Sequence, residues 1–512
     1  MQRLLRVSAV VVALAQPAIS GEWRPAGLQP AAVSLAGVLA ARERALGAPE
    51  PRERRERWTY VHGETRIPVG VAVRGDDVRA TMRVAGATYE QGRLNGVRWR
   101  ADANGVVHAT WSDEQNDPLD RLPQSLFPVA AADCELAGET RGPNPEWVLV
   151  DRAVRDKPHW LFIDERSGDV VREMTRVGKR TVETTFSKFF SDPADGGARR
   201  PHAWHVADGD RADDLDVTVD AVAPGPVGED DVALVEARRT FAAPETAGER
   251  IAVPASFRGA RIDVTVGVAG KQRLFVLDSG TQGIELSAGA TGGRVPVTLG
   301  HATISTLSVG ALALADASVL VVPESFGADG ILGADFFYGH VVHIDYARRT
   351  VEVMSRAAAA DAFDRGKALV MPIDVDEGIP LLAGRIAGEP APRIALDTGS
   401  AHPNVLAPFL DRYGAELARR SRAARFPGRR AASVRTDEYL EGSIVVTARD
   451  VGELDLGRVG FRDVVAGVQT ANARADAMSL PLDAIVGTDQ LRSLELWFDY
   501  DDGLLAVRRA QG

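Results

Sequence analysis

Cysteine is almost absent from this chain, so covalent cross-links do not hold its fold together. The single cysteine, Cys134, excludes a disulfide within the chain and any cysteine-rich metal site. The sequence also lacks His-Glu-x-x-His, Gly-x-Ser-x-Gly and the phosphate-binding Gly-x-x-x-x-Gly-Lys-Ser/Thr loop. These absences argue against zinc hydrolases, enzymes with a serine on a nucleophile elbow, and P-loop enzymes.

An excess of positive charge is also missing. Lys and Arg total 60 against 71 Asp and Glu, which gives a formal net charge of -11. Nucleic acids and anionic membrane surfaces repel such a chain, so we expect neither as a partner. Hydrophobic residues make up 45% of the 512 residues, which is ordinary for a globular protein and enough for the cores of about two to four domains.

Long apolar runs are confined to the N-terminus. There, Arg3 and Arg6 precede the apolar run 7–15, and Ala18-Ile19-Ser20 supplies small residues for a cleavage site. This order is typical of a secretory signal peptide, which we place at residues 1–20. The run is too short to span a bilayer, and no cysteine follows it for a lipid anchor. We expect no membrane span and a location in the periplasm or outside the cell.

The first half of the chain predicts an antiparallel sheet. Residues 24–50 are rich in alanine and predict a short helical lead-in, whereas from 51 to 220 apolar and polar residues alternate, which predicts successive hairpins of unknown role. Within them, "WLFIDERSGDVVREMTRVGKRTVETTFSKFF" (160–190), followed by "PHAWHV", resembles the sheet of bacterial lipoprotein-carrier half-barrels. That resemblance brings no catalytic residues. The Pro- and Gly-rich segment 221–250 then predicts a linker.

A repeat fills the rest of the chain. Asp278-Ser279-Gly280-Thr281 and Asp397-Thr398-Gly399-Ser400 each follow an apolar, strand-like run. Each is followed by a second related segment, "DGILGAD" from 329 and "DAIVGTD" from 483. The offset between the copies is 119 residues at the first motif and 154 at the second, so the second copy holds 35 extra residues between its motifs. We interpret the repeat as an internal duplication with one copy expanded.

Each copy resembles one lobe of a retropepsin-like aspartic protease, in the bacterial single-chain form. The resemblance places lobe 1 at 251–356 and lobe 2 at 366–510. It implies a mainly β fold in which two barrel-like lobes follow the antiparallel sheet and are related by a pseudo-twofold axis. It also implies that Asp278 and Asp397 are catalytic and meet at this axis. Their neighbours would support them. Ser279 and Thr398 would brace the opposite loop, and Thr281 and Ser400 would hydrogen-bond the carboxylates. Gly280 and Gly399, which have no side chain, would let the substrate and the other lobe approach closely.

The residue types suit this chemistry. Two carboxylates within hydrogen-bonding distance cannot both ionise at low cost, so the pair shares a proton. The ionised Asp can then activate a water, while the protonated Asp polarises the peptide carbonyl. This mechanism needs no metal and no organic cofactor.

The two copies differ in what could cover the site. In lobe 1 a covering flap must fit within "GGRVPVTLGHATISTLSVG" (292–310), which contains no Tyr or Trp. Lobe 2 has room for a helix with a basic loop at 408–430 and for a hairpin at 434–461, on which Tyr439 is a candidate cover residue. Asp335 and Asp489 follow the two Ile-Leu/Val-Gly segments, and we expect each to cap the short helix that starts there.

Three interpretations follow from these patterns. The leading one is an exported aspartic-type endopeptidase that acts on peptides or unfolded proteins as a monomer, with an intramolecular pseudo-dimer. The alternative is a non-catalytic periplasmic binding or scaffold protein that uses the duplicated lobes as a peptide clamp. In the third, the two copies are separate domains that each pair with another chain. The separation of the two carboxylates distinguishes them, because the protease needs both within hydrogen-bonding reach.

Overall fold

The computed structural model describes residues 24–510, except for the segments 49–50, 96, 102–103, 106, 109–133, 152–158, 178–179, 192–196, 208–213, 235–239, 243–248, 260, 294–295, 298–299, 324–326, 365, 377, 427–432, 440–441 and 470–481. The predicted signal peptide lies outside the described residues. Strands dominate the rest, so the mainly β class expected from the sequence is confirmed. No helix in the described part of the chain combines the length and hydrophobicity needed to cross a membrane.

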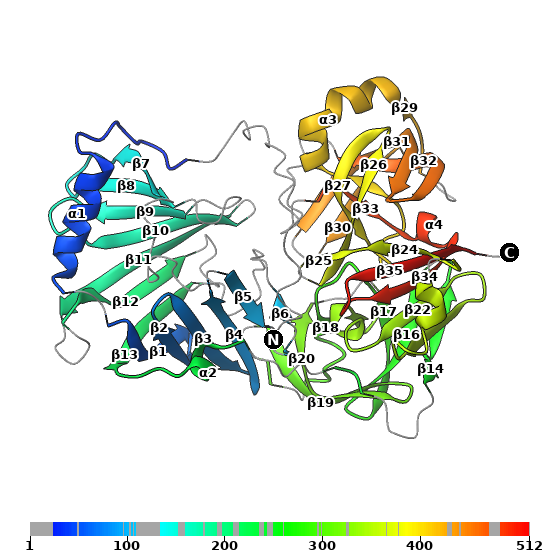
Figure 1. The fold of residues 1–512 in the computed structure, drawn as a ribbon, viewed down its shortest axis with the longest axis horizontal. Helices are drawn as coiled ribbons and strands as arrows, with labels where there is room; N and C mark the ends of the chain where they lie inside the picture. Colours follow the sequence, from blue (N-terminus) through cyan, green and yellow to red (C-terminus); the bar gives the residue numbers. More distant parts are fainter. Residues whose placement is uncertain are drawn as a thin grey trace.

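The N-terminal half forms one 13-stranded antiparallel sheet, in the order β6-β5-β4-β3-β2-β1-β13-β12-β11-β10-β9-β8-β7 (Figure 1). β1 (Glu53–His62) pairs with β2 on one side and with β13, the last strand of the sheet in the chain, on the other. All other neighbours are consecutive in the chain, as expected for a series of hairpins. The remaining strands are β2 (Thr65–Arg74), β3 (Asp77–Val84), β4 (Ala87–Leu94), β5 (Val97–Ala101), β6 (Val107–His108), β7 (Cys134–Glu139), β8 (Glu146–Asp151), β9 (His159–Asp164), β10 (Val170–Val177), β11 (Arg180–Ser191), β12 (Arg199–Ala207) and β13 (Leu215–Pro224).

Buried and exposed side chains alternate along its strands, so one face of the sheet is buried. In β1, Arg54, Glu56, Trp58 and Tyr60 are buried, and the residues between them are more exposed. The helix α1 (Leu35–Leu46) begins at Ser34, whose hydroxyl accepts a hydrogen bond from the backbone N–H of the third helical residue. It packs on the sheet through Val38, which is fully buried in a cluster with side chains of β8 and β9.

Two smaller closed sheets follow, one for each copy of the repeat. The first has the order β15-β16-β17-β21-β18-β20-β19 and closes through a β16–β19 pairing. The second has the order β25-β26-β27-β33-β28-β32-β31-β29, closes through a β26–β31 pairing, and carries β30 on β31. The first set is β15 (Ala255–Arg258), β16 (Arg261–Val268), β17 (Lys271–Leu277), β18 (Ile284–Ser287), β19 (His301–Val309), β20 (Leu312–Val322) and β21 (Gly330–Leu332). The second set is β25 (Asp374–Asp376), β26 (Ile379–Ile386), β27 (Glu389–Leu396), β28 (Asn404–Val405), β29 (Arg422–Ala423), β30 (Val434–Tyr439), β31 (Gly442–Leu456), β32 (Val459–Gln469) and β33 (Ala484–Val486).

The same unusual strand pairing occurs in both copies. β21, which carries Ile-Leu, lies between β17 and β18, parallel to the first and antiparallel to the second. β33, which carries Ile-Val, lies between β27 and β28 in the same way. Because β17 and β27 end at the two Asp-Ser/Thr-Gly loops, each crossing strand passes directly behind one of these loops.

A third sheet joins the two copies, in the order β14-β23-β22-β34-β35-β24. Its centre is an antiparallel pairing of β22 (Val341–Asp345) from lobe 1 with β34 (Leu494–Asp499) from lobe 2. The outer strands are β14 (Arg250–Ala252), β23 (Thr350–Met354), β35 (Leu504–Arg509) and β24 (Leu369–Pro372). One hydrophobic core continues through both copies.

The segment 221–250, expected to be a linker, contains packed residues in its described part. The short helix α2 (Glu229–Val232) lies on the large sheet, where Asp231 forms an ion pair of 2.5 Å with Arg55. Further along, Phe241 is buried with its ring centre 5.4 Å from that of Phe336 in lobe 1. The segment therefore contacts the large sheet near one end and lobe 1 near the other.

Most of the extra length of lobe 2 forms the elements expected there. The helix α3 (Ala407–Arg420) follows β28, and β30 and β31 form a hairpin with Tyr439 opposite Gly442. The side chain of Tyr439 lies outside the described part of the structure, so its predicted role as a cover residue stays a prediction.

Candidate active site

The two Asp-Ser/Thr-Gly loops are held at the ends of equivalent strands. Asp278 is the first residue after β17, and Asp397 is the first residue after β27. The backbone N–H of each donates to a carbonyl of its crossing strand, Asp278 to Leu332 and Asp397 to Val486, both at 3.0 Å. The chain therefore delivers two carboxylates in matching positions, one from each copy.

A reciprocal set of hydrogen bonds joins the two loops. The Ser279 hydroxyl donates to the carbonyl of Leu396 at 2.8 Å and accepts from the N–H of Thr398 at 3.1 Å. The Thr398 hydroxyl likewise donates to the carbonyl of Leu277 at 2.9 Å and accepts from the N–H of Ser279 at 3.0 Å. Both side chains are fully buried. This bracing fixes the two loops against each other and does not fit the interpretation in which the copies are separate domains.

The carboxyl groups of Asp278 and Asp397 lie close enough for each to act on the pKa of the other, and each lies beside the glycine of the opposite loop. The backbone N–H of Gly280 donates to Asp278 at 2.7 Å, and that of Gly399 donates to Asp397 at 2.8 Å. The Thr281 hydroxyl adds a bond of 3.1 Å to Asp278. Two carboxyl groups this close cannot both ionise at low cost, so the pair has the geometry of a shared-proton site.

Glycine is required beside each carboxyl group. A Cβ atom on Gly280 would lie 2.5 Å from Cγ of Asp397, and a Cβ on Gly399 would meet the carboxylate of Asp278 even more closely. No side chain fits at either position without moving the opposite aspartate. Gly399 is also exposed, so the site opens to solvent on this side.

The environment raises the pKa of both aspartates. Burial is the main cause for each, and hydrogen bonds such as the one from Gly280 to Asp278 offset part of the effect. The negative charge of Asp278 further raises the pKa of Asp397, which lies well above the ordinary value of 3.8. Because the proton belongs to the pair, the two groups titrate together.

Two tyrosines at equivalent positions of the two copies, Tyr346 and Tyr500, lie within electrostatic reach of this pair. Burial, followed by the charge of Asp397, raises the pKa of Tyr346. Burial, and then neighbouring groups that include both aspartates, raises the pKa of Tyr500. Both hydroxyls are buried and have no hydrogen-bond partner among the described residues, and their raised pKa keeps them protonated.

Two expectations about neighbouring side chains differ from the structure. The hydroxyl of Ser400 donates to the carbonyl of His402 at 3.3 Å, and it is the backbone N–H of Ser400 that reaches Asp397, at 2.7 Å. The expected helix caps are wrong, because Gly333 and Gly487 occupy the cap positions and no side chain caps either helix. Asp335 and Asp489 lie two residues after the cap in each case, inside the first turn, and bind other partners.

The cover expected over lobe 1 is reduced in the structure. Residues 301–309 of the predicted flap segment form β19, which pairs along its length with β20 and also with β16. These residues belong to the body of the lobe and do not form a flap. In lobe 2, the β30–β31 hairpin packs beside the strand after the catalytic loop, where the Arg435 guanidinium lies 3.4 Å from the Asn404 side chain.

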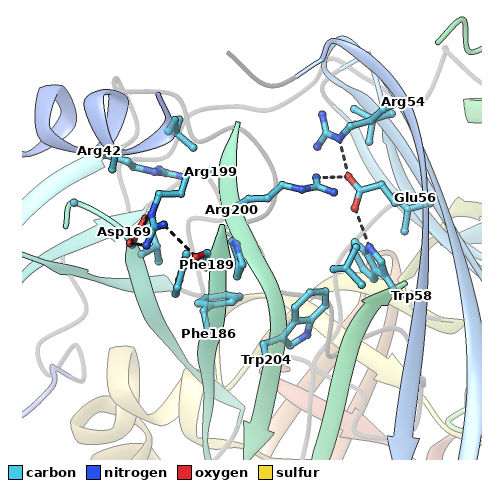
Figure 2. A pocket seen from close by; sticks show the side chains of 18 residues that line it. Arg42, Arg54, Glu56, Trp58, Asp169, Phe186, Phe189, Arg199, Arg200 and Trp204 are labelled. Atoms are coloured by element: carbon cyan, nitrogen blue, oxygen red, sulfur yellow. Dashed lines mark hydrogen bonds and ion pairs between the residues drawn. The ribbon is translucent and has the colours of Figure 1, made fainter. Parts of the chain in front are cut away.

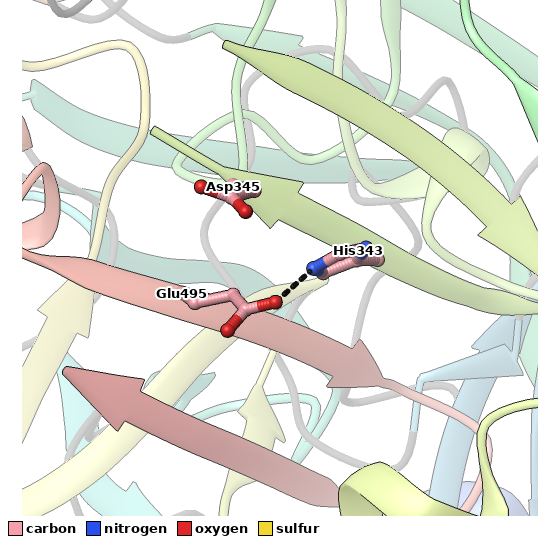
Figure 3. A group of neighbouring side chains, drawn as sticks. All are labelled: His343, Asp345 and Glu495. Carbon is pink, nitrogen blue, oxygen red and sulfur yellow. Dashed lines mark hydrogen bonds and ion pairs between the residues drawn. The ribbon is translucent and has the colours of Figure 1, made fainter. Parts of the chain in front are cut away.

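In the described part of the chain, one group of side chains brings together atoms of the kinds that bind metal ions. His343, Asp345 and Glu495 place such atoms within 4.8 Å of one another on the paired strands β22 and β34 (Figure 3). Both ring nitrogens of His343 already contact carboxylates, Nδ1 that of Glu352 at 3.2 Å and Nε2 that of Glu495 at 3.1 Å. The contact with Glu495 ties β22 of lobe 1 to β34 of lobe 2 within the sheet that joins the lobes.

A pocket lies apart from Asp278 and Asp397, between α1 and the buried face of the large sheet (Figure 2). It has a volume of about 70 Å³, and its apolar lining includes Trp58, Phe186 and Trp204. Its charged lining has more cations than anions, namely Arg42, Arg54, Arg199 and Arg200 against Glu56 and Asp169.

The acidic groups of this pocket are held by its arginines. Burial alone would raise the pKa of Glu56, but the positive charges of Arg200 and Arg54 outweigh this effect and lower it. Arg199 forms an ion pair of 3.1 Å with Asp169. Sequence reasoning missed this pocket, although alternate buried positions of β1 carry Arg54 and Glu56 where apolar residues would be ordinary.

Comparisons with known proteins give only distant likenesses. No protein-family model matches the chain, and no curated protein matches it. Among solved structures, an aspartic proteinase from Irpex lacteus is 14% identical with a TM-score of 0.33, covering 51% of this chain and 98% of its own. A LolA superfamily protein from Nitrosomonas europaea is 10% identical with a TM-score of 0.31, covering 40% of this chain and 98% of its own. A putative outer membrane lipoprotein-sorting protein domain from Vibrio parahaemolyticus is 10% identical with a TM-score of 0.29, covering 39% of this chain and 95% of its own.

Proposed function

We propose that the chain is an exported aspartic-type endopeptidase that hydrolyses peptide bonds with a water activated between Asp278 and Asp397. The observation that carries this proposal is the close approach of the two carboxyl groups, in loops braced by Ser279 and Thr398. Export rests on the signal-peptide pattern of residues 1–20. Both aspartates come from one chain, so the site does not depend on association of two copies.

The chemistry follows from one shared proton. The ionised carboxylate takes a proton from the bound water, whose oxygen attacks the peptide carbonyl. The protonated carboxyl donates to the carbonyl oxygen as negative charge develops there. The departing amine takes the proton that came from the water. As the C–N bond breaks, a hydroxyl of the tetrahedral intermediate returns its proton to the other carboxylate, so the pair again holds one proton. Extended peptides are the natural substrates, because pairing with strands beside the cleft satisfies their backbone groups.

Water attack gives this proposal a direct test. An unfolded protein substrate is incubated with the wild-type chain in H₂¹⁸O from pH 3 to 8, in the presence of a chelator and of serine- and cysteine-directed reagents. We expect cleavage that leaves one ¹⁸O in each new C-terminus, and no product trapped by hydroxylamine, because no acyl-enzyme forms. Absence of cleavage over the whole pH range would contradict the proposal, and a hydroxylamine adduct would replace water attack with a covalent mechanism.

A second function is favoured by the pocket of the large sheet. We propose that it binds a small organic anion, with the apolar part on Trp58, Phe186 and Trp204 and the charge among the arginines. Its net positive lining supplies the attraction, and its volume limits the apolar part to a few carbon atoms.

Intrinsic tryptophan fluorescence measures this binding, because two tryptophans line the pocket. We expect hexanoate to bind more tightly than hexanol, which lacks the charge, and than acetate, which lacks the chain. Replacing Arg42 with Gln should weaken hexanoate binding by about 5- to 10-fold, since it removes one cation contributed by α1. Arg462→Gln, on an exposed side chain of lobe 2, is the matched control. Equal affinity for hexanoate and hexanol would rule out an anion site.

A further inference from the structure

The two lobes hold one equivalent aspartate in different ways. Asp489 of lobe 2 is hydrogen-bonded by Nδ1 of His402, a residue of the same loop as Asp397. In lobe 1 the equivalent of Asp489 is Asp335, and the position equivalent to His402 is Gly283, which has no side chain. Lobe 1 therefore lacks the partner with which lobe 2 holds its own aspartate.

A residue of the large N-terminal sheet occupies this place in lobe 1. The side-chain amide of Asn104, between β5 and β6, donates to Oδ2 of Asp335 at 2.7 Å. A Cβ atom on Gly283 would lie 3.7 Å from the same Oδ2, so a side chain at that position would point to the atom that Asn104 binds. Both Asn104 and Asp335 are buried, at 3% and 2% exposure.

Asn104 is itself fixed to lobe 1 by further bonds. Its amide nitrogen also donates to the carbonyl of Ser318 at 3.1 Å, and its oxygen accepts from the N–H of Ser318 at 2.9 Å. The Tyr89 hydroxyl of β4 lies 2.7 Å from His301 and 3.0 Å from Ser318. Figure 1 shows this edge of the large sheet, β4 to β6, beside β18 to β20 of lobe 1.

The segment that carries Asp335 holds the catalytic loop from behind. The N–H of Gly333 donates to the carbonyl of Gly283 at 3.0 Å, and the N–H of Ala334 donates to that of Thr281 at 2.9 Å. Thr281 in turn donates its hydroxyl to Asp278. A shift of Asp335 therefore reaches Asp278 through one backbone bond and one side-chain bond.

We propose that Asn104 is a positioning residue that the N-terminal sheet supplies to lobe 1, in place of the side chain that lobe 2 carries at His402. The inference rests on the proposed protease function and extends it. It makes the sheet a permanent part of the catalytic unit, so removal of the sheet inactivates the enzyme, in contrast to removal of an inhibitory prosegment.

Asn104→Ala tests the proposal in the full-length chain. We expect kcat for an unfolded-protein substrate to fall about 10-fold with KM changed less than about twofold, because a group that positions the dyad acts on the chemical step. Adding Gly283→His to this variant, which reproduces the lobe 2 arrangement, should restore at least half of the lost kcat. Thr303→Val is the matched control, because it removes a contact to the same sheet, with the carbonyl of Ala85, that has no link to Asp335.

Hydrogen exchange of the segment 278–287 gives a readout that does not need activity. Exchange should accelerate in Asn104→Ala, return towards wild type in Asn104→Ala/Gly283→His, and remain unchanged in Thr303→Val. If the protease proposal fails because the wild type cleaves nothing, this comparison still decides the role of Asn104. Unchanged exchange and kcat in Asn104→Ala, or a double variant no better than the single one, would overturn the inference. Asn104→Ser, too short to span Ser318 and Asp335, replaces Asn104→Ala in both readouts if that variant folds poorly.

Discussion

Replacing either Asp278 or Asp397 with Asn should reduce kcat by at least about 100-fold, while Asp397→Asn makes the protein more stable at neutral pH. The loss of activity arises because an amide can neither take a proton from water nor share one with the opposite carboxyl group. Both single variants should lose activity to a similar extent, because the proton belongs to the pair. Cleavage by either variant at the wild-type rate would exclude the two-aspartate mechanism.

The gain in stability follows from the direction of the pKa shift. Burial and the charge of Asp278 raise the pKa of Asp397 in the folded protein, so folding favours its neutral form. The stabilisation from the neutral form is complete below the ordinary value of 3.8 and is lost as pH rises through the raised pKa of the folded state. Asn has no charge to bury, so the difference in melting temperature between Asp397→Asn and wild type should grow from pH 4 to pH 7.

Thermal melting from pH 3 to 8 measures this difference. Asp361→Asn is the control for loss of a carboxylate, because Asp361 is exposed and forms its ion pair with Lys367 on the surface. It should leave kcat unchanged and alter the pH dependence of melting only slightly, because its ion pair is exposed to solvent. A melting difference for Asp397→Asn that shrinks as pH rises would contradict the assigned direction of the pKa shift.

Removing the bracing hydroxyls should cost more stability than most single substitutions. Ser279→Ala leaves the N–H of Thr398 and the carbonyl of Leu396 without a partner at a fully buried site. Thr398→Val does the same to the N–H of Ser279 and the carbonyl of Leu277. We expect each variant to lose about 2–4 kcal/mol of unfolding free energy, since each buried group left unpaired costs about 1–3 kcal/mol.

Loss of the bracing bonds should also lower the activity, because the two braced loops carry Asp278 and Asp397. A displacement of about 1 Å between reacting groups lowers a rate by about 100-fold. Chemical denaturation gives the stability, and kcat on an unfolded substrate gives the activity. Ser279→Thr and Thr398→Ser are the matched controls, since each lobe already uses the other's hydroxyl residue at this position. Unfolding of Ser279→Ala at the wild-type denaturant concentration would show that the bracing bonds do not hold the lobes together.

Local sequence patterns were sufficient to predict the repeated elements. Alternation of apolar and polar residues predicted the hairpins of the large sheet, because each strand buries one face. The duplicated Asp-Ser/Thr-Gly segments, each after an apolar run, predicted two equivalent loops at the ends of strands. These patterns depend on neighbours in the chain, and the structure contains the corresponding strands.

Contacts between distant segments were not predictable in the same way. Asn104 lies in a turn with no motif, and its bond to Asp335 depends on how the large sheet lies against lobe 1. The orientation of the Ser400 hydroxyl towards His402 depends on a single side-chain torsion. A comparison of the two copies offered one signal that was missed, namely a histidine at 402 where the first copy has Gly283.

The pairing of β22 with β34 has a consequence for how the two halves can change. In an assembly of two identical chains, every substitution occurs twice, so a change tolerated on one side must also be tolerated on the other. Here the two sides of the junction belong to one polypeptide, and each position mutates alone. One half could therefore keep a short loop and a glycine at 283 while the other gained 35 residues and a histidine at 402. The covalent link thus frees the two halves to specialise around a site that remains nearly symmetric.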